Sequence, residues 1–179
     1  ARGMLDVVGA ELVVVANTAD DVELYGAHVS PDPDLCTFWL ADRIDARGWG
    51  LDGDSFEVMA GLRELGVDVW FNLGDRDLAI GLERSRRLAD GERLTETLAA
   101  LTAAFGLAAR VVPMSDQIVR TRVRAEGRNS VTISRRSEGE AWRDTTLSVR
   151  ADGLATLALG AVSAPIAVRV NDGLSDRSR

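Results

Sequence analysis

Three residue types are absent or scarce in this sequence, and each scarcity excludes a kind of site. The 179 residues include no lysine, so the chain holds neither a Walker-type phosphate-binding lysine nor a Schiff-base lysine. The single cysteine, Cys36, permits no internal disulfide and no thiolate pair for zinc, which is typical of a reducing compartment, and we expect a cytoplasmic protein. The single histidine, His28, has no nucleophile or metal-ligand companion at a suitable spacing, so a structural or incidental role is expected for it.

Long apolar runs and an excess of positive charge are also missing. No run approaches the roughly 20 apolar residues of a membrane-spanning helix, and we expect a soluble protein without a membrane partner. The formal net charge of −7 argues against a nucleic-acid partner, because neutralising phosphates requires a basic face. These absences favour small molecules as the partners of this chain.

The composition changes near Ala125. Residues 1–124 hold 21 of the 28 acidic residues and 13 of the 21 arginines, whereas residues 125–179 hold 7 acidic residues and 8 arginines. We therefore predict a core domain of residues 1–124 and an unassigned tail of residues 125–179. From residue 119 onward we expect short strands, which make the tail β-rich, at residues 119–123, 131–134, 146–149 and 166–170.

The core alternates between strand and helix signals. Residues 12–16 form a mostly β-branched run that predicts a strand buried on both faces, and residues 4–8 before it have helical spacing. Helices are predicted at residues 54–65, opened by a capping box at Asp54, at residues 75–88, and at residues 95–105, capped by Thr95. Residues 110–112 return as a strand. The predicted fold class is α/β, an incomplete Rossmann-like, mostly parallel sheet that is covered by helices and lacks its first strand.

Four carboxylates follow the first predicted strand in two short segments. They lie in Asn17–Asp21 and Ser30–Asp34, both of which we expect to be loops. Ligands of open α/β sheets bind beyond the carboxyl ends of the strands. Clustered carboxylates repel one another unless a cation or a proton lies among them, and Mg²⁺ commonly takes one or two of them with substrate phosphates. Asx turns and a proline-rigid loop explain the same residues without a ligand, so both interpretations stay open.

Three further segments fit either a ligand or ordinary structure. Leu73–Asp77 places acids and Arg76 at a helix start, where they cap the helix or where Arg76 and free N–H groups bind phosphate. Arg47–Gly50 carries a tryptophan between glycines, as a packed anchor or as a surface for a flat ring. Pro113–Asp116 follows a strand and forms either a turn or a ligand-lining loop.

The order and spacing of these segments resemble one enzyme family. The segments follow one another as NTADD (17–21), SPDPD (30–34), RGWG (47–50), LGDRDLA (73–79) and PMSD (113–116). Over residues 1–124 they resemble the 2-phospho-L-lactate transferase family of coenzyme F420 biosynthesis. The resemblance implies a transferase that moves a phospholactyl or phosphoenolpyruvyl group from a GDP-linked donor to the deazaflavin Fo, with Mg²⁺ as cofactor and with release of GMP.

The resemblance also implies the residues of the site. Asp20 and a carboxylate of the SPDPD segment, Asp34 or Asp32, should hold the Mg²⁺ ion. Asp34 and Asn72 should contact Fo, with Asp34 as the catalytic residue that orients or deprotonates the hydroxyl of the acceptor.

Other implications concern the helix start and the ends of the chain. Asp75 and Arg76 are further candidates for substrate binding. The sequence begins at Ala1, just past the place of the family's Gly-rich, donor-binding loop, so we expect a piece of a longer protein with little or no activity of its own. The family's later segments are not recognisable after residue 125, which suits a diverged end or a shifted reading frame. A non-catalytic metabolite-binding regulator and an inactive fragment remain alternatives, and homodimer formation is left open.

Overall fold

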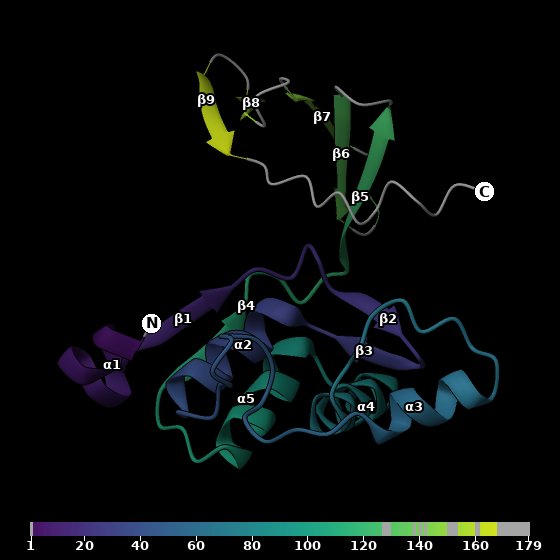
Figure 1. Cartoon of the computed structure of the whole chain (residues 1–179). Coiled ribbons are helices and arrows are strands. Elements are labelled where there is room, and N and C mark those ends of the chain that lie inside the picture. Colours follow the sequence, from purple (N-terminus) through teal and green to yellow (C-terminus); the bar gives the residue numbers. More distant parts are fainter. Residues whose placement is uncertain are drawn as a thin grey trace. The chain divides into compact units, whose positions relative to one another are not determined.

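The structure is a computed structural model that describes residues 2–126, 130–137, 139, 141, 143–149, 154–159 and 162–167, with side chains described for residues 2–120, 139 and 141. The chain divides into two units, residues 1–119 and residues 120–179. Figure 1 shows the helices gathered in the first unit and the long strands in the second. No helix in the described ranges is long and apolar enough to cross a membrane.

A parallel pair of strands organises one half of the first unit. Strand β1 (Val13–Ala16) pairs in parallel with β4 (Arg110–Pro113), after helix α1 (Arg2–Val8) and the 3-10 turn η1 (Gly9–Glu11). Helices α2 (Pro31–Leu40) and α5 (Leu94–Ala104) pack against this pair (Figure 1). A parallel pair covered by helices confirms the predicted α/β class and is compatible with an incomplete Rossmann-like sheet.

The burial of β1 differs from the prediction. Val13 and Val15 are 47% and 66% exposed, so the expectation of burial on both faces is wrong. The opposite face carries the core, because Val14 and Ala16 pack there in one cluster with Leu40 of α2 and Val111 of β4. A β-branched run is favourable in any strand, and the pattern alone could not show that only one face is covered.

A short hairpin that the sequence analysis did not predict lies between β1 and α2. Strands β2 (Val22–Leu24) and β3 (Ala27–Val29) pair antiparallel around Tyr25 and Gly26, whose φ angles are 52° and 83°. Two consecutive positive φ angles match the twist of a hairpin, but Asn-Gly is the usual signature of such a turn and Tyr-Gly is not. The hairpin contributes to a core cluster that joins it to the two helices that follow α2: Leu24, Ala27, Val29, Met59, Leu73 and Leu78.

Helices α3 (Glu57–Glu64) and α4 (Asp75–Ala89) cap each other. The Asp75 carboxylate accepts two backbone N–H groups of the first turn of α3 at 3.0 Å, and the Asp54 carboxylate accepts two from the first turn of α4 at 2.9 and 3.3 Å. The helix predicted after Asp54 is confirmed, but its predicted local capping box is wrong, because its cap comes from α4. A Cβ on Gly74 would lie 2.2 Å from Asp54 Oδ2, so the contact between Asp54 and the start of α4 requires glycine at this position.

Two other helix starts also differ from the predictions. Pro31–Asp34 is the first turn of α2 rather than a loop, with Pro31 in the first turn, where a missing N–H is tolerated. Helix α5 begins at Leu94, so Thr95 is not its cap. The Thr95 hydroxyl and N–H donate to Asp116 Oδ1 at 2.7 and 2.8 Å. These hydrogen bonds hold the segment after β4 against the first turn of α5.

Beyond residue 119 the described chain consists of strands paired in chain order. They are β5 (Val119–Glu126), β6 (Ser130–Ser137), β7 (Arg143–Val149), β8 (Leu154–Leu159) and β9 (Val162–Ala167). The pairs from β6 to β9 are antiparallel. The strands predicted here overlap β5, β6, β7 and β9, and β8 was not predicted. Residues 168–170 of the last predicted strand lie outside the described residues.

Candidate ligand-binding site

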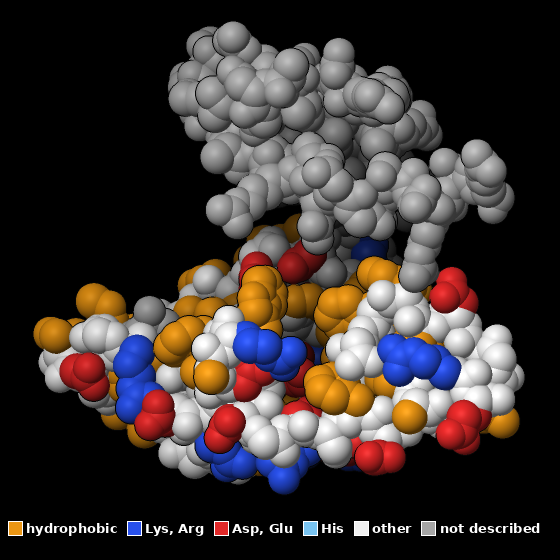
Figure 2. Space-filling model, viewed as in Figure 1, with side chains coloured by type: hydrophobic (Ala, Val, Ile, Leu, Met, Phe, Trp, Pro, Cys, Tyr) orange, Lys and Arg blue, Asp and Glu red, His pale blue; other side chains and the backbone are white. Residues whose placement is uncertain are grey.

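A cavity of about 230 Å³ opens in the first unit between β3, α2, the loop before α3 and the start of α4. Apolar side chains and three carboxyl groups line it. The lining residues are Val29, Pro31, Asp34, Leu35, Phe38, Arg47, Trp49, Gly50, Leu51, Asp54, Phe56, Phe71, Asn72, Leu73, Gly74 and Asp77. Figure 2 shows acidic side chains set among apolar ones near the middle of one face of this unit.

Aromatic rings form much of the cavity wall. Trp49 and Phe71 are 66% and 43% exposed where they border the cavity, and Phe38 is buried behind them. Trp49 is therefore not a packed loop anchor. Exposed ring faces beside a cavity are typical of a site for a flat ligand.

Asp34 of α2 borders the cavity and pairs with a buried arginine. Arg84 of α4 is fully buried, its Nη2 donates to Asp34 Oδ1, and its Nη1 donates to the carbonyl oxygen of His28 at 2.8 Å. Burial raises the pKa of Asp34, and the Arg84 charge opposes this rise without cancelling it. The ion pair therefore holds the Asp34 carboxylate, through its Oδ1, against Arg84 at the border of the cavity.

Helix α4 also binds the backbone of β3, which fixes Arg84 in turn. Ser85 Oγ accepts the N–H of His28 at 2.7 Å, while Arg84 binds the carbonyl oxygen of the same residue. A Cβ on Gly81 would lie 3.1 Å from Ala27 Cβ, so the helix and the strand are in close contact. Strand β3 and helix α4 thus fix Arg84, and Arg84 positions the Asp34 carboxylate.

Asp77 faces the cavity from the first turn of α4. Its backbone N–H donates to Asp54 Oδ2 at 3.3 Å, but no donor in the described part of the chain reaches its own carboxyl group. Burial, followed by the charges of Asp34 and Asp54, raises the pKa of Asp77 to about 7. Near neutral pH a large fraction of this carboxyl group is un-ionised.

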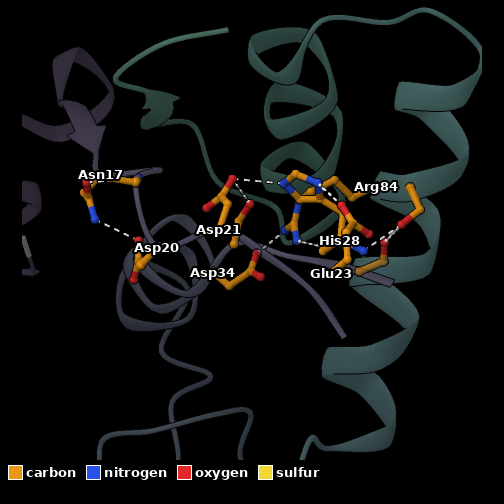
Figure 3. Close-up of polar contacts among 11 residues, drawn as sticks. Asn17, Asp20, Asp21, Glu23, His28, Asp34 and Arg84 are labelled. Carbon is orange, nitrogen blue, oxygen red and sulfur yellow. Dashed lines mark hydrogen bonds and ion pairs between the residues drawn. The ribbon is translucent and has the colours of Figure 1, made fainter. Parts of the chain in front are cut away.

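The His28 side chain belongs to a separate polar group. Its Nε2 lies 3.0 Å from Asp21 Oδ2 and its Nδ1 lies 3.0 Å from Glu23 Oε1 (Figure 3). The Ser30 hydroxyl donates to Asp21 Oδ2 at 2.8 Å. These contacts join the hairpin to the start of α2, which agrees with the structural role expected for His28.

Asp20 and Asp32 meet at the side-chain amide of Asn17. The Asn17 Nδ2 donates to Asp20 Oδ1 at 2.8 Å and to Asp32 Oδ2 at 3.0 Å. Partial burial, together with the charges of Asp32 and Asp21, raises the pKa of Asp20. Figure 3 shows Asp20 turned toward Asn17, whereas Asp34 is turned toward Arg84.

The neighbourhood of these two carboxylates holds further unsatisfied oxygens. Thr18 Oγ1 and Asp21 Oδ1 are buried without a hydrogen-bond partner among the described residues. Within those residues, no three or more His, Cys, Asp or Glu side chains form a group that could hold a metal by itself. The described residues therefore offer two carboxylates that share the Asn17 amide rather than a complete protein cage.

The structure places the predicted site residues in three different surroundings. Asp34 and Asn72 line the same cavity. The Asp75 carboxylate is engaged at the start of α3, where hydrogen bonds, led by that of the Ser55 hydroxyl, hold its pKa below the ordinary value. Arg76 is exposed and does not line the cavity, and Asp20 belongs to the cluster around Asn17.

Sequence reasoning did not single out three residues of the site: Asp54, Asp77 and Arg84. Asp77 lies in the LGDRD segment, and Arg84 follows it by seven residues, a spacing that places both on one face of a helix. From this spacing, the sequence could have predicted that Asp77 and Arg84 lie on the same face of the helix. Nothing local indicates that Asp54 caps α4, because the contact crosses 22 residues of sequence.

Comparison with known sequences identifies a family. The sequence model of the family described as 2-phospho-L-lactate transferase CofD matches residues 1–160. A Methanosarcina mazei protein named 2-phospho-L-lactate transferase is 41% identical over 119 residues, which cover 65% of this chain and 39% of that protein.

Two bacterial relatives carry a second name. A Kitasatospora aureofaciens protein named phosphoenolpyruvate transferase is 41% identical over 127 residues, covering 69% of this chain and 40% of that protein. A Mycobacterium leprae protein of the same name is 42% identical over 117 residues, covering 64% and 35%. The chain thus spans two fifths or less of the length of these curated relatives.

Proposed function

The chain belongs to the 2-phospho-L-lactate transferase family, and from this premise we propose that it serves coenzyme F420 biosynthesis, in the transfer of a phospholactyl or phosphoenolpyruvyl group. The donor in this proposal is a GDP-linked molecule, the acceptor is the deazaflavin Fo, and GMP is released. The first unit supplies the acceptor site.

The acid-lined, aromatic cavity is the observation that carries the proposal. Asp34, Asp54 and Asp77 line it, and the arginine in its lining, Arg47, is engaged with Asp45 through a 2.8 Å hydrogen bond from its Nε. Asp34 is paired with Arg84 and Asp77 is partly un-ionised near neutral pH, so the lining offers a diphosphate no unpaired positive charge, whereas ring faces and hydrogen-bonding carboxyl groups favour a flat molecule that carries hydroxyl groups. The cavity therefore fits the acceptor better than the donor.

Asp34 acts on the acceptor hydroxyl in this proposal. Arg84 occupies one of its oxygens, which leaves the other to accept a hydrogen bond from a hydroxyl group in the cavity. Transfer to that hydroxyl requires orientation and removal of its proton, and a fixed carboxylate can do both. Asn72 also lines the cavity, and because its Oδ1 accepts a hydrogen bond from Arg63 Nη2 at 2.8 Å, its Nδ2 is the atom that can donate to the ligand.

Mg²⁺ completes the proposed function, with Asp20 and Asp32 as its protein ligands. Mg²⁺ is usually bound by one or two carboxylates, with water and substrate phosphates in the other positions, and the convergence of two carboxylates on Asn17 fits that pattern. The contacts favour Asp32 over Asp34, which Arg84 already engages. Bound Mg²⁺ supplies positive charge to the phosphate oxygens of the donor.

Titration of Fo, followed by its own fluorescence, tests the acceptor site. The 179-residue chain should bind Fo without any donor, and Asp34→Asn should raise Kd by about 10-fold, because a charged hydrogen-bond acceptor is lost. Glu64→Gln, at an exposed position of α3, is the matched control and should bind like the wild type. Equal Kd values in the wild type and Asp34→Asn, or no binding at all, would contradict the proposal.

Binding of Mn²⁺ as a paramagnetic substitute tests the metal ligands. Electron paramagnetic resonance should show weaker Mn²⁺ binding in Asp20→Asn and in Asp32→Asn, with folding checked by circular dichroism. Asp34→Asn should bind Mn²⁺ like the wild type. Weakening by Asp34→Asn but not by Asp32→Asn would reverse the assignment.

A further inference from the structure

Asp77 is a partly buried carboxyl group that the described chain leaves without a hydrogen-bond donor. It borders the cavity, and the charged groups around it are Asp34 on α2, Asp54 and Asp45 in the segments before α3, and Arg84 on its own helix. Because the carboxyl group faces the cavity, water or a ligand in the cavity can supply the hydrogen bonds that the described residues do not.

The fold gains little from an acid at this position. Burial and the neighbouring carboxylates raise the pKa of Asp77 to about 7, which means that its surroundings disfavour the charged form. An acid near a helix start favours the helix dipole, but Asp54 already accepts the free N–H groups of the first turn of α4. An ionisable group that is costly to the fold and faces a cavity is typical of a functional site.

We propose that Asp77 hydrogen-bonds the acceptor ligand directly and, together with Asp34, determines which ligands the cavity accepts. This inference rests on the proposed function, because it takes the cavity to be the acceptor site. A carboxyl group with its proton has a donor and an acceptor side by side. It can pair with an amide-type edge of a heterocyclic ring or with a hydroxyl group, and both chemistries occur in a deazaflavin with a hydroxylated chain.

The space beside Asp77 is left open by a glycine. A Cβ on Gly50 would lie 3.4 Å from Asp77 Oδ2, so the loop that carries Trp49 approaches the carboxyl group without placing a side chain against it. Gly50 has a φ of 68°, a conformation that glycine adopts without strain. A ligand ring that lies beside Trp49 would therefore occupy the same cavity as the Asp77 carboxyl group.

Two substitutions of Asp77 separate a ligand contact from a structural role. Asp77→Leu removes both hydrogen-bonding atoms at similar size, and we expect it to raise the Kd for Fo by about 10-fold or more, because the ligand group loses its partner. Asp77→Asn keeps one donor and one acceptor, and we expect a Kd within about 3-fold of the wild type. Both variants should have a higher Tm than the wild type at pH 8, because both remove an unfavourable buried acid.

A second probe shows whether Asp77 pairs with the ring of the ligand or with its hydroxylated chain. A deazaflavin with a methyl group in place of the hydroxylated chain keeps the ring and loses the hydroxyl groups. If Asp77 pairs with the ring, Asp77→Leu weakens this probe as much as it weakens Fo. If Asp77 pairs with the chain, the wild type and Asp77→Leu bind this probe equally, while Fo still distinguishes them.

Three results would overturn the inference. Equal Kd values for Fo in the wild type and Asp77→Leu refute the contact while leaving the proposed function intact. Loss of Fo binding together with a lower Tm in both variants would show a structural residue. Absence of Fo binding by the wild type refutes the proposed function and this inference with it, and that result is distinct from the other two.

Discussion

Gly74 shows how the absence of one side chain holds two helix starts together. Its φ and ψ of −67° and 154° are open to any residue, so backbone freedom does not explain the glycine. The reason is space, because a Cβ at this position would lie 2.2 Å from the Asp54 oxygen that caps α4. The Asp54 carboxylate also borders the cavity, so a change at Gly74 that displaces Asp54 affects both the cap of α4 and the lining of the site.

Gly74→Ala should destabilise the first unit by about 1–3 kcal/mol, since the new methyl group displaces the Asp54 cap. Urea denaturation followed by circular dichroism measures the change. Gly61→Ala is the control, because Gly61 lies inside α3 with open space around its Cβ position, and alanine there should stabilise by about 0.5–1 kcal/mol. Similar effects at the two positions would contradict the steric explanation.

The pKa of Asp77 near 7 gives the stability of the protein a pH dependence of known sign. Below pH 3.8 both the folded and unfolded states hold this proton, and between pH 3.8 and about 7 only the folded state holds it. Stability therefore falls as pH rises through this window and stays low above it. Compared with Asp77→Asn, the wild type should be progressively less stable from pH 5 to pH 8, by at most about 3 kcal/mol, at 1.4 kcal/mol for each pH unit between pH 5 and the pKa of about 7.

Urea unfolding of both proteins at pH 5, 6, 7 and 8 measures this difference. The two unfolding free energies should diverge as the pH rises. Parallel curves over the whole range would show that the Asp77 carboxyl group titrates normally and is not disfavoured in its charged form.

At the scale of elements, the hairpin β2–β3 supports one wall of the cavity. The Tyr25 hydroxyl donates to the Phe71 carbonyl oxygen at 2.7 Å and accepts the Phe71 N–H at 3.2 Å. Phe71 and Asn72 border the cavity in a segment without helix or strand structure. The hairpin turn therefore provides this segment with hydrogen bonds that regular structure would otherwise supply.

Tyr25→Phe should loosen the segment while leaving the hairpin folded. We expect a loss of about 1–2 kcal/mol in unfolding free energy, because two hydrogen bonds disappear, and faster amide hydrogen exchange at Phe71 than in the wild type. Fo binding should weaken by a few-fold, since the cavity wall is less ordered. Unchanged exchange at Phe71 would show that the segment does not depend on the hairpin.

The elements also show what the sequence could predict and what it could not. Helix α4 and strand β4 lie within one residue of their predicted bounds, because helix-start residues and a β-branched run mark them locally. The hairpin was missed because Tyr25 occupies a position where asparagine is usual, and the first turn of α2 was taken for a loop because two prolines dominate it. The helix caps are exchanged between α3 and α4, and no local pattern carries that information.

In the candidate site, too, the contacts between distant segments are those that the sequence did not predict. The contacts of Asp34 and Asn72 with Fo were predicted through the family resemblance alone, and the two residues line one cavity, a placement that does not test their roles. Asp54 and Asp77 were missed because their meaning depends on segments that approach only in the folded chain. The role of Arg84 was hidden by composition, since a charged residue in an amphipathic helix is expected on the exposed side and this one is fully buried.

At the scale of the whole molecule, charge separates the two proposed substrates. The formal net charge is −7, and three of the carboxyl groups that contribute to it line the cavity. Such a surface does not attract a diphosphate, so donor and acceptor should occupy different places. GDP at millimolar concentration should therefore leave the Kd for Fo unchanged within about 2-fold, as measured by fluorescence titration, and competition between GDP and Fo would contradict this separation.

The central claim is that the first unit binds the acceptor in its acid-lined cavity, and a crystal structure of the 179-residue chain with Fo tests it most directly. The account predicts electron density for the ring beside Trp49 and Phe71, with Asp34 and Asp77 within hydrogen-bonding distance of the ligand. Density for Fo elsewhere on the chain, with an empty cavity, would contradict it.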